Sequence, residues 1–501
     1  MTDTASRQQT LFVLLPSINV WNRDEPSESL SFLRLAGRQV APRRGTRGAP
    51  TALQAAGAVL HILDRVAPAD TVLVSLSGAQ RLALQREHPG LRIVPVIELA
   101  PLWYRRTRVL PVLGPANQKK RNVEVLVLDA ATDQPMAGVD VVGFIDREQR
   151  VGAAGVTNAK GIARLSLPFG LPTLEVIEAV PPAGHWPGFI KRVKLDDGTP
   201  TLRCHPIDLA EPGAMAHYGL HGGDGDGAGV KVGVVDTGVS RHPDLRLKRA
   251  RNVVRGEPAN DADDEVGHGT HVAGIIAGRG KPGQGMRGVA PAAELHAYRV
   301  FGKGEGTATS FNVAKAIRQA VDDGCDLINL SLGGAEEVPE VWREIQRARA
   351  MGVVCVAATG NDYRAPVGYP GRYSQVLAVS ACGRRGTFPA SAGQTLTIAK
   401  PHGTDPKDFI ADFSNVGCEV KLTGPGVGIV STVPGGYAVM DGTSMACPAM
   451  TGSLARLLAR DGKLLGAARN QHRSDAIFKL ALDAARPLGF GEDFEGAGLL
   501  V

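Results

Sequence analysis

The sequence predicts an α/β fold for its larger, C-terminal part: a mostly parallel sheet with helices on both faces, preceded by two smaller units. From residue 229 onward, apolar strand-like runs such as "VKVGVVD" alternate with helix-like runs such as "TSFNVAKAIRQAV". This alternation is typical of parallel sheets covered by helices. Upstream of that region the pattern of apolar and polar residues changes twice. A chain of 501 residues is long enough for about three domains.

The first unit, residues 1 to 118, is expected to be a small α+β module of the ferredoxin-like kind. Its apolar run "LFVLL" and the later "TVLVSL" and "RIVPVIEL" favour strands, and "GAQRLALQREHP" favours a helix. The spacing of Leu53, Leu60 and Leu63 predicts a further helix between them.

The second unit, residues 119 to 211, has short alternating runs such as "VEVLVLDA" and "GIARLSLP" separated by turn-rich pieces, which predicts a small β-sandwich. Residues 212 to 228, including "GLHGGDGDGAG", are predicted to be a Gly/Asp-rich linker. Residues 229 to 501 are then predicted to form the α/β domain.

Composition favours a globular protein with no membrane span, because 43% of residues are apolar, 21% are charged, and no stretch of about 20 apolar residues occurs. The early run "LFVLLPSINV" is short, contains a proline and follows the polar "MTDTASRQQT". We interpret it as a core strand and not as a signal peptide.

Charge gives no reason to expect a nucleic-acid partner. The net charge is only +6, and the basic clusters "RQVAPRRGTR", "YRRTR" and "KKRN" lack the interleaved aromatic residues of a stacking surface. The six cysteines lack metal-type spacing, so they are expected to be unpaired thiols. A cytoplasmic location is therefore favoured, with secretion by another route left open.

Three residues at strand ends or helix starts form a candidate catalytic set. Asp236 closes the strand "KVGVVD", His268 opens "HGTHVAGIIAG", and Ser444 opens the helix-like "SMACPAM". Each alone has an ordinary explanation: a turn aspartate, a capped or core histidine, and a helix cap. Together they supply the nucleophile, base and orienting acid that serine catalysis needs. Asn361 ends another apolar strand, and its amide could donate to an oxyanion opposite the Ser444 N–H.

The four motifs "VVDTGV", "GHGTHVAG", "AATGN" and "GTSMACP" resemble the signature blocks of the subtilisin-like serine proteases, peptidase family S8. The chain order Asp, His, Ser is the order known for that family. The resemblance extends over residues 229 to 501 and implies a serine endopeptidase, made as a zymogen, that cuts extended or unfolded polypeptides. It implies that Asp236 orients His268, that His268 is the general base, and that Ser444 attacks the peptide carbonyl. Asn361 and the Ser444 N–H would form the oxyanion hole.

The resemblance also implies a substrate path. Two backbone stretches would hold an extended substrate between them by edge pairing. One is "SLGG", with Ser331, Leu332 and Gly333; the other is "GEG", with Gly304 and Gly306.

Small residues would leave room for a bulky side chain in the S1 pocket, which receives the residue before the cleaved bond. Ala358 and Gly360 would line one wall, Gly368 would form the floor, and Asp362 at the rim could accept Lys or Arg.

No cofactor is expected to be required, although one calcium site is considered. The stretch "GRGKPGQGMRG" replaces the asparagine-bearing loop that binds calcium in many relatives, which disfavours an ion there. Ahead of His268, Asp261, Asp263 and Asp264 are either a calcium site or a solvated acidic loop.

The regions outside the α/β domain resemble other modules. Residues 1 to 118 resemble the inhibitory propeptide of the family, and the following unit resembles prealbumin-like or carboxypeptidase-regulatory-like sandwiches. The propeptide resemblance implies an intramolecular inhibitor, with "LWYRRTRVLPVLG" lying between "GEG" and "SLGG" as a substrate mimic. An insertion at residues 387 to 412 has no predicted function.

Two alternatives to hydrolysis remain open at this point. In one, the fold serves as a non-catalytic scaffold that binds peptides. In the other, the same triad passes the acyl group to an amine, which would make the protein a peptide ligase or cyclase.

Overall fold

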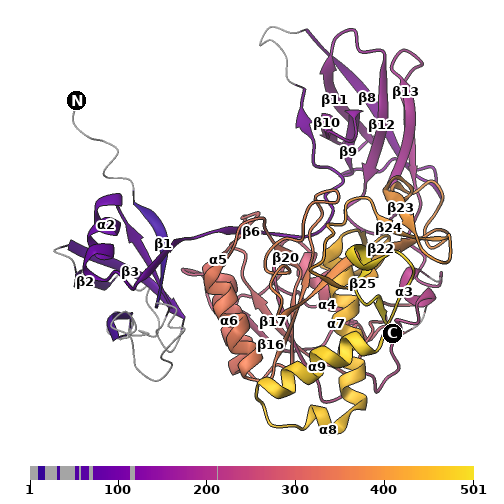
Figure 1. The fold of residues 1–501 in the computed structure, drawn as a ribbon. Helices are drawn as coiled ribbons and strands as arrows, with labels where there is room; N and C mark the ends of the chain where they lie inside the picture. Colours follow the sequence, from indigo (N-terminus) through magenta and orange to yellow (C-terminus); the bar gives the residue numbers. More distant parts are fainter. Residues whose placement is uncertain are drawn as a thin grey trace, which may run out of the picture.

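The computed structural model describes residues 9–16, 31–33, 51–55, 58–66, 71–112, 119–211, 213–281 and 283–501. The basic cluster at 38–47 lies outside these residues. Figure 1 shows three parts: a small N-terminal module, a β-sandwich, and a large α/β domain between them. An extended segment crosses from the N-terminal module over the α/β domain toward the sandwich.

The α/β domain is built on a sheet that has 11 strands in the described residues, and the α/β class predicted from the sequence is confirmed. Neighbours from β16 to β29 pair in parallel, while β28, β24 and β23 pair antiparallel to their partners. In sheet order, the strands are β16 (Leu247–Asn252), β17 (Glu294–Arg299), β15 (Lys231–Asp236), β19 (Leu327–Leu330), β21 (Val354–Ala358), β22 (Val376–Arg384), β25 (Val420–Pro425), β29 (Leu499–Leu500) and β28 (Ala485–Arg486), with β24 (Asp408–Ala411) and β23 (Ile398–His402) attached to β22.

Helices cover both faces of this sheet because its central strands are apolar on both faces. On β15, Val234 belongs to one buried cluster and Val235 to another. The first cluster contains the apolar residues of α4 (His268–Ala277) and α7 (Thr443–Arg460). The second contains those of α5 (Ser310–Asp322) and α6 (Pro339–Ala350).

The segment predicted to be a linker is instead packed into the α/β domain. It contains the short helix α3 (Ala214–His217), and Met215, Tyr218 and Leu220 are buried in the same cluster as α4 and α7. The Tyr218 hydroxyl donates to Asp408 Oδ1 at 2.8 Å. The prediction of a linker followed from the many glycines and aspartates in this stretch and overlooked the three apolar residues that are buried.

The second part is a sandwich of two sheets around one apolar core. One sheet has the order β13-β12-β9-β10-β7 and the other β11-β8-β14. The strand β7 (Leu110–Pro111) lies upstream of the predicted start at residue 119 and pairs in parallel with β10. The remaining strands are β8 (Lys120–Asp129), β9 (Asp140–Asp146), β10 (Val151–Val156), β11 (Ile162–Pro168), β12 (Thr173–Val180), β13 (Gly188–Lys194) and β14 (Thr201–Cys204).

The insertion at 387 to 412 joins the sandwich to the α/β domain. It contributes β23 and β24 to the large sheet and carries the 3₁₀ helix η2 (Gly393–Thr397). From η2, Leu396 packs against Val142, Phe144 and Val176 of the sandwich. The insertion therefore gives the sandwich an apolar docking point.

The N-terminal module is an antiparallel sheet of order β2-β3-β4-β1-β5 with the helix α2 (Gly78–Glu87). Its strands are β1 (Thr10–Leu15), β2 (Thr51–Ala55), β3 (Ala58–Val66), β4 (Thr71–Leu76) and β5 (Arg92–Pro95).

The helix predicted across residues 53 to 63 is wrong, because this stretch forms the hairpin of β2 and β3. Leu60 and Ile62 face the module's own core, whereas Leu63 and Val66 belong to a cluster on the opposite face. A strand with two apolar faces lacks the simple alternation that would have identified it.

That opposite face of the module sits on α5 of the α/β domain. Phe311 of α5 is buried with Val13, Leu15 and Val66. Near this contact, Lys315 Nζ lies 2.6 Å from Asp64 Oδ2. The N-terminal module is therefore docked by both apolar burial and an ion pair.

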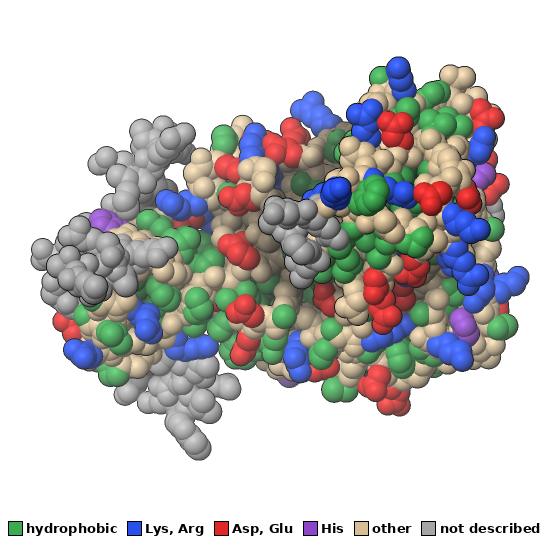
Figure 2. All heavy atoms as spheres, turned by 90° about the horizontal axis from the view of Figure 1, so that it is seen from above, with side chains coloured by type: hydrophobic (Ala, Val, Ile, Leu, Met, Phe, Trp, Pro, Cys, Tyr) green, Lys and Arg blue, Asp and Glu red, His purple; other side chains and the backbone are tan. Residues whose placement is uncertain are grey.

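All six cysteines are free thiols, and five of them are buried. In the described residues, no helix is long and apolar enough to cross a membrane. Figure 2 shows basic and acidic side chains interspersed over the face that it presents.

Candidate active site

Asp236 and His268 lie in contact at the carboxyl edge of the large sheet. Asp236 is the last residue of β15 and His268 the first of α4. Nδ1 of His268 lies 2.6 Å from Oδ1 of Asp236, and both side chains are buried. The other ring nitrogen, Nε2, has no hydrogen-bond partner, so it is available to a neighbouring proton donor.

A glycine permits this contact. A Cβ on Gly269 would lie 2.1 Å from the carbonyl oxygen of Gly238 and 3.1 Å from Cβ of Asp236. Any side chain there would push the start of α4 away from β15, so the histidine could not reach the carboxylate.

Ser444 lies in the first turn of α7 and is fully buried. Its hydroxyl donates to the carbonyl oxygen of Ser331 at 2.9 Å and makes no hydrogen bond to His268. Further along the helix, burial raises the pKa of the Cys447 thiol to about 12, so this thiol does not compete as a nucleophile.

Two donors converge on one carbonyl oxygen beside Ser444. Oδ1 of Asn361 accepts from the backbone N–H of Thr443 at 2.9 Å, which leaves its Nδ2 free to donate outward. That Nδ2 donates to the carbonyl oxygen of Leu102, and the Ser444 N–H donates to the same oxygen at 3.0 Å. Two convergent donors on one carbonyl have the geometry of an oxyanion hole.

The residues before Leu102 fill the groove that leads to this carbonyl. The strand β6 (Glu98–Pro101) lies between β18 (Ala308–Thr309) and β20 (Leu332–Gly333), antiparallel to both. The N–H of Leu102 donates to the carbonyl of Ser331 at 3.0 Å. The chain's own backbone thus occupies the groove as an extended third strand.

Two details of the predicted path are corrected. Gly304 and Gly306 precede the paired strand, whose edge is formed by Ala308 and Thr309. The segment between the edges is residues 98 to 101, not the "LWYRRTRVLPVLG" stretch that starts at Leu102. In both cases the pattern identified the right region but missed the register by a few residues.

Gly333 lies next to the side chain of Leu102, and hydrogen bonds from their N–H groups fix two of the predicted S1 residues, Gly360 and Gly368. A Cβ on Gly333 would lie 3.0 Å from Cδ1 of Leu102. Gly360 donates its N–H to Thr443 Oγ1 at 3.2 Å, and Gly368 donates to the carbonyl of Thr359 at 2.9 Å.

The other two predicted S1 residues differ in exposure. Ala358 ends β21 and is buried in the core under α7. Asp362 is exposed, and its Oδ2 lies 3.3 Å from Nδ2 of Asn415.

Beyond Leu102 the chain remains tightly held. The ring of Trp103 meets the His268 ring edge-on at 5.6 Å. Tyr104 stacks on Phe413 at 4.7 Å, and its N–H donates to the carbonyl of Asp441 at 2.7 Å. The sequence predicted that the segment from Leu102 onward occupies the site, but it missed residues 98 to 101 as the strand in the groove, because nothing local distinguishes an extended segment that pairs there.

The acidic loop before His268 does not fit a calcium site. Oδ2 of Asp264 accepts from the N–H and the hydroxyl of Thr270, and its Oδ1 accepts from Thr237 Oγ1. Asp261 instead pairs with Lys303 at 2.8 Å. Across the part of the chain that the structure describes, no group of three or more His, Cys, Asp or Glu residues is placed to bind a metal ion.

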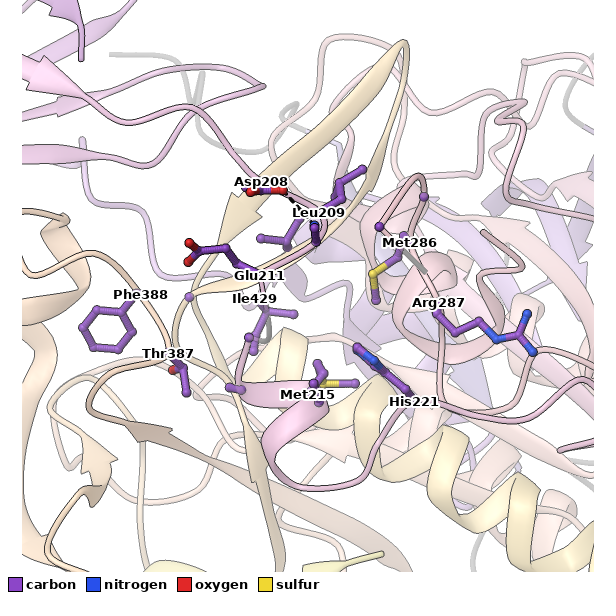
Figure 3. A pocket seen from close by; sticks show the side chains of 18 of the residues that line it. Asp208, Leu209, Glu211, Met215, His221, Met286, Arg287, Thr387, Phe388 and Ile429 are labelled. Atoms are coloured by element: carbon purple, nitrogen blue, oxygen red, sulfur yellow. Dashed lines mark hydrogen bonds between the residues drawn. The ribbon is translucent and has the colours of Figure 1, made fainter. Parts of the chain in front are cut away.

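A separate cavity of about 1140 Å³ lies between the end of the sandwich and the α/β domain (Figure 3). Met215, Met286 and Ile429 line it, with Asp208 and Arg287 among its charged residues. Asp236, His268 and Ser444 are not among its lining residues, so it is distinct from the candidate active site.

The fold and the site together define a serine endopeptidase on a mostly parallel α/β sheet, and comparison with known sequences agrees. The sequence model of the Subtilase family matches residues 227–489, and the chain belongs to that family.

Several curated relatives are subtilisins. Subtilisin BL of Lederbergia lenta is 38% identical over 230 residues, which cover 46% of this chain and 76% of that protein. Subtilisin Savinase of the same organism is 38% identical over 231 residues, with the same coverage. Subtilisin DY of Bacillus licheniformis is 36% identical over 240 residues, covering 47% of this chain and 78% of that protein.

Proposed function

We propose that the protein hydrolyses extended or unfolded polypeptides through an acyl-enzyme on Ser444, and that it is made as a self-restrained precursor. One observation carries this proposal: the carbonyl of Leu102 accepts from both the Ser444 N–H and the Asn361 amide. The chain therefore presents one of its own peptide bonds where a substrate bond would react. Leu102 stands for the residue before the cut, and Trp103 for the residue after it.

The proposed chemistry follows from the positions of four side chains. The Ser444 hydroxyl turns from the Ser331 carbonyl toward Nε2 of His268, which takes the proton as Oγ attacks the carbonyl carbon. Asp236 holds the ring through Nδ1 and stabilises the imidazolium.

The negative charge on the carbonyl oxygen is stabilised by Asn361 and the Ser444 N–H. The imidazolium then gives its proton to the departing amine, and water releases the acyl group by the reverse sequence.

The N-terminal module acts as the restraint in this proposal. Its sheet packs on Phe311, and β6 continues from it into the groove between β18 and β20. At the entry, Ile97 and Ser310 exchange two hydrogen bonds, of 2.7 and 3.1 Å. A tethered segment has an effective concentration in the mM range for short linkers, so even modest affinity keeps the groove filled.

The test compares the full chain with its Ser444→Ala variant by intact-mass analysis and N-terminal sequencing. The active chain should yield one fragment ending at Leu102 and one beginning at Trp103, while the variant stays whole. The active chain should also gain activity on added peptides as the fragment that ends at Leu102 dissociates. A full-length active chain that cleaves added peptides without any self-cleavage would contradict the precursor proposal.

A second outcome of the same chemistry is acyl transfer to an amine. It is favoured by one observation, the firm hold on the leaving-group half through Tyr104 and Asp441. A leaving amine that stays in place can attack the acyl-enzyme and re-form the bond. Mass analysis of products formed with an added free-amine peptide separates ligation from hydrolysis.

A further inference from the structure

Four residues after Leu102, the side chain of Arg106 enters a closed acidic pocket and is only 4% exposed. Its Nε donates to Oδ2 of Asp441 at 2.9 Å. Its Nη1 donates to Oε2 of Glu178 at 3.0 Å and to the carbonyl oxygen of Gly393 at 2.8 Å.

Three separate parts of the protein supply these acceptors. Asp441 precedes α7 in the α/β domain, Glu178 lies on β12 of the sandwich, and Gly393 opens η2 of the insertion. Both carboxylates are buried, with 3% of Asp441 and none of Glu178 exposed. A binding pocket for a cation is thus assembled where the three parts meet.

Arg106 is the cation in direct contact with both carboxylates of the pocket, and the nearby Arg147 is shared between Glu178 and Asp412. Glu178 has a second cationic neighbour, because Nε of Arg147 lies 3.7 Å from its Oε1. Burial lowers the pKa of the Arg106 guanidinium, but Asp441 and Glu178 raise it more, so its pKa is above the ordinary value. Without Arg106, one carboxylate would remain buried without a counter-charge, which strongly disfavours an empty pocket.

The arrangement of acceptors suits a guanidinium better than an ammonium. Two different nitrogens, Nε and Nη1, reach acceptors on different sides of the planar group. Lysine would present a single point charge on a flexible stem and could not keep this fork geometry.

The pocket also belongs to the substrate path. The backbone carbonyl of Asp441 accepts from the N–H of Tyr104, two residues after the presented bond, while its side chain binds Arg106 two residues further on. One residue therefore contacts both the backbone and a side chain of the leaving-group half.

We propose that Asp441, Glu178 and the Gly393 carbonyl form an arginine-binding subsite that recognises the fourth residue after the cleaved bond. This inference rests on the proposed function. In the intact chain Arg106 occupies the subsite and positions the leaving-group half. Once that segment is displaced, the subsite selects polypeptides with arginine at that position, and Glu178 makes the sandwich part of substrate recognition.

The first experiment tests binding without catalysis, in the full chain carrying Ser444→Ala. The further change Arg106→Ala leaves the pocket without its guanidinium group. The melting temperature of this double variant is then measured as guanidinium chloride is added up to about 20 mM. Sodium and ammonium chloride at equal ionic strength are the controls. We expect a saturable rise in melting temperature with guanidinium alone, and no such rise in the chain that retains Arg106.

Glu178→Gln, added to the same double variant, should remove the guanidinium effect. Its matched control is Glu124→Gln, at a partly exposed glutamate of the same sandwich that pairs with Arg164, and this change should leave the effect intact. An unsaturable response, or an equal response with Arg106 present, would overturn the subsite. Because Ser444 is absent, this result does not depend on whether the chain cleaves itself.

The second experiment uses the catalytically active chain and remains informative if Arg106→Ala fails to fold. Arg106→Lys should slow cleavage after Leu102 at least tenfold, while Arg108→Lys, at an exposed position, should leave the rate unchanged. In a peptide library, the activated wild type should enrich arginine four residues after the cut, and Glu178→Gln should lose that enrichment. Unchanged cleavage in Arg106→Lys, or no enrichment by the wild type, would overturn the proposal.

Discussion

The carbonyl oxygen of Leu102 lies 3.0 Å from the backbone nitrogen of Ser444 and accepts its hydrogen bond. This contact links a residue of the N-terminal third of the chain to the first turn of α7. Since Asn361 donates to the same oxygen, the contribution of the second donor can be measured on the chain's own bond.

Replacing Asn361 with leucine should slow cleavage between Leu102 and Trp103 by about 10² to 10³-fold. The amide matters most when negative charge builds on the oxygen, so the docked ground state should change little. The measurement is the rate of fragment appearance, with the melting temperature recorded to establish that the variant is folded. A folded variant slowed by less than tenfold would mean that the amide is not an oxyanion donor.

Shortening the side chain at the cut should also slow self-cleavage, because Leu102 loses apolar burial against Gly333. A loss of about 1.4 kcal/mol in the transition state corresponds to about tenfold in rate. Leu102→Ala should therefore be slowed by about that factor, whereas Leu110→Ala, at an exposed leucine, should not. Leu102→Lys should be cut faster than Leu102→Asp if Asp362 lies at the S1 rim, as predicted from the sequence; the reverse order would contradict the predicted pocket.

A charge at Leu99 should release the restraint. Leu99 is fully buried in the α/β domain core beside Ala308, so Leu99→Asp would place a carboxylate in an apolar environment. We expect β6 to leave the groove more readily and hydrolysis of an added fluorogenic peptide to begin sooner.

Leu82→Asp is the matched control for this effect, because Leu82 is 50% exposed on α2 and does not face the groove. If both variants behave alike, or if Leu99→Asp has no effect in a folded protein, β6 is not the restraining element.

His271, also on α4, should make stability depend on pH. It is fully buried with Nε2 3.0 Å from the carbonyl of Ile429, and burial followed by the neighbouring His268 lowers its pKa to about 3. The unfolded chain, with an ordinary pKa of about 6.5, binds the proton first as pH falls. The contribution of His271 is thus complete above pH 6.5 and is lost progressively between about pH 6.5 and 3.

Denaturant unfolding in the Ser444→Ala chain measures this slope. Between those pH values the free energy of unfolding should fall by up to about 1.4 kcal/mol per pH unit more than in His271→Gln. Equal slopes in the two chains would show that His271 does not stay neutral in the fold.

The candidate catalytic side chains could be located from the sequence, because each was predicted at the end of a strand or the start of a helix and the structure confirms those positions. Asp236, His268 and Ser444 need only those local positions to be brought to one edge of a parallel sheet. The resemblance of the first module to a propeptide predicted a segment in the groove, and the structure places β6, which follows that module, between β18 and β20.

Register and long-range partners could not be predicted in the same way. The sequence "GEGTATS" does not indicate that Ala308 and Thr309, and not the glycines before them, pair with β6. Pairing at a strand edge depends on the backbone and not on side-chain identity. Likewise, the basic stretch that contains Arg106 looks like a solvated loop. Its buried environment exists only through Glu178 and Asp441, which are remote in sequence.

The contacts of Arg106 also set an order of events for the proposed precursor. Its three acceptors are separated from it by 72, 287 and 335 residues along the chain. Contacts across such distances form only late, after the units that carry them have folded and docked. In the proposed precursor, alignment of the bond after Leu102 would therefore act as a checkpoint: a molecule with an unfolded sandwich, or an undocked insertion, would lack the anchor that sets this bond for cutting.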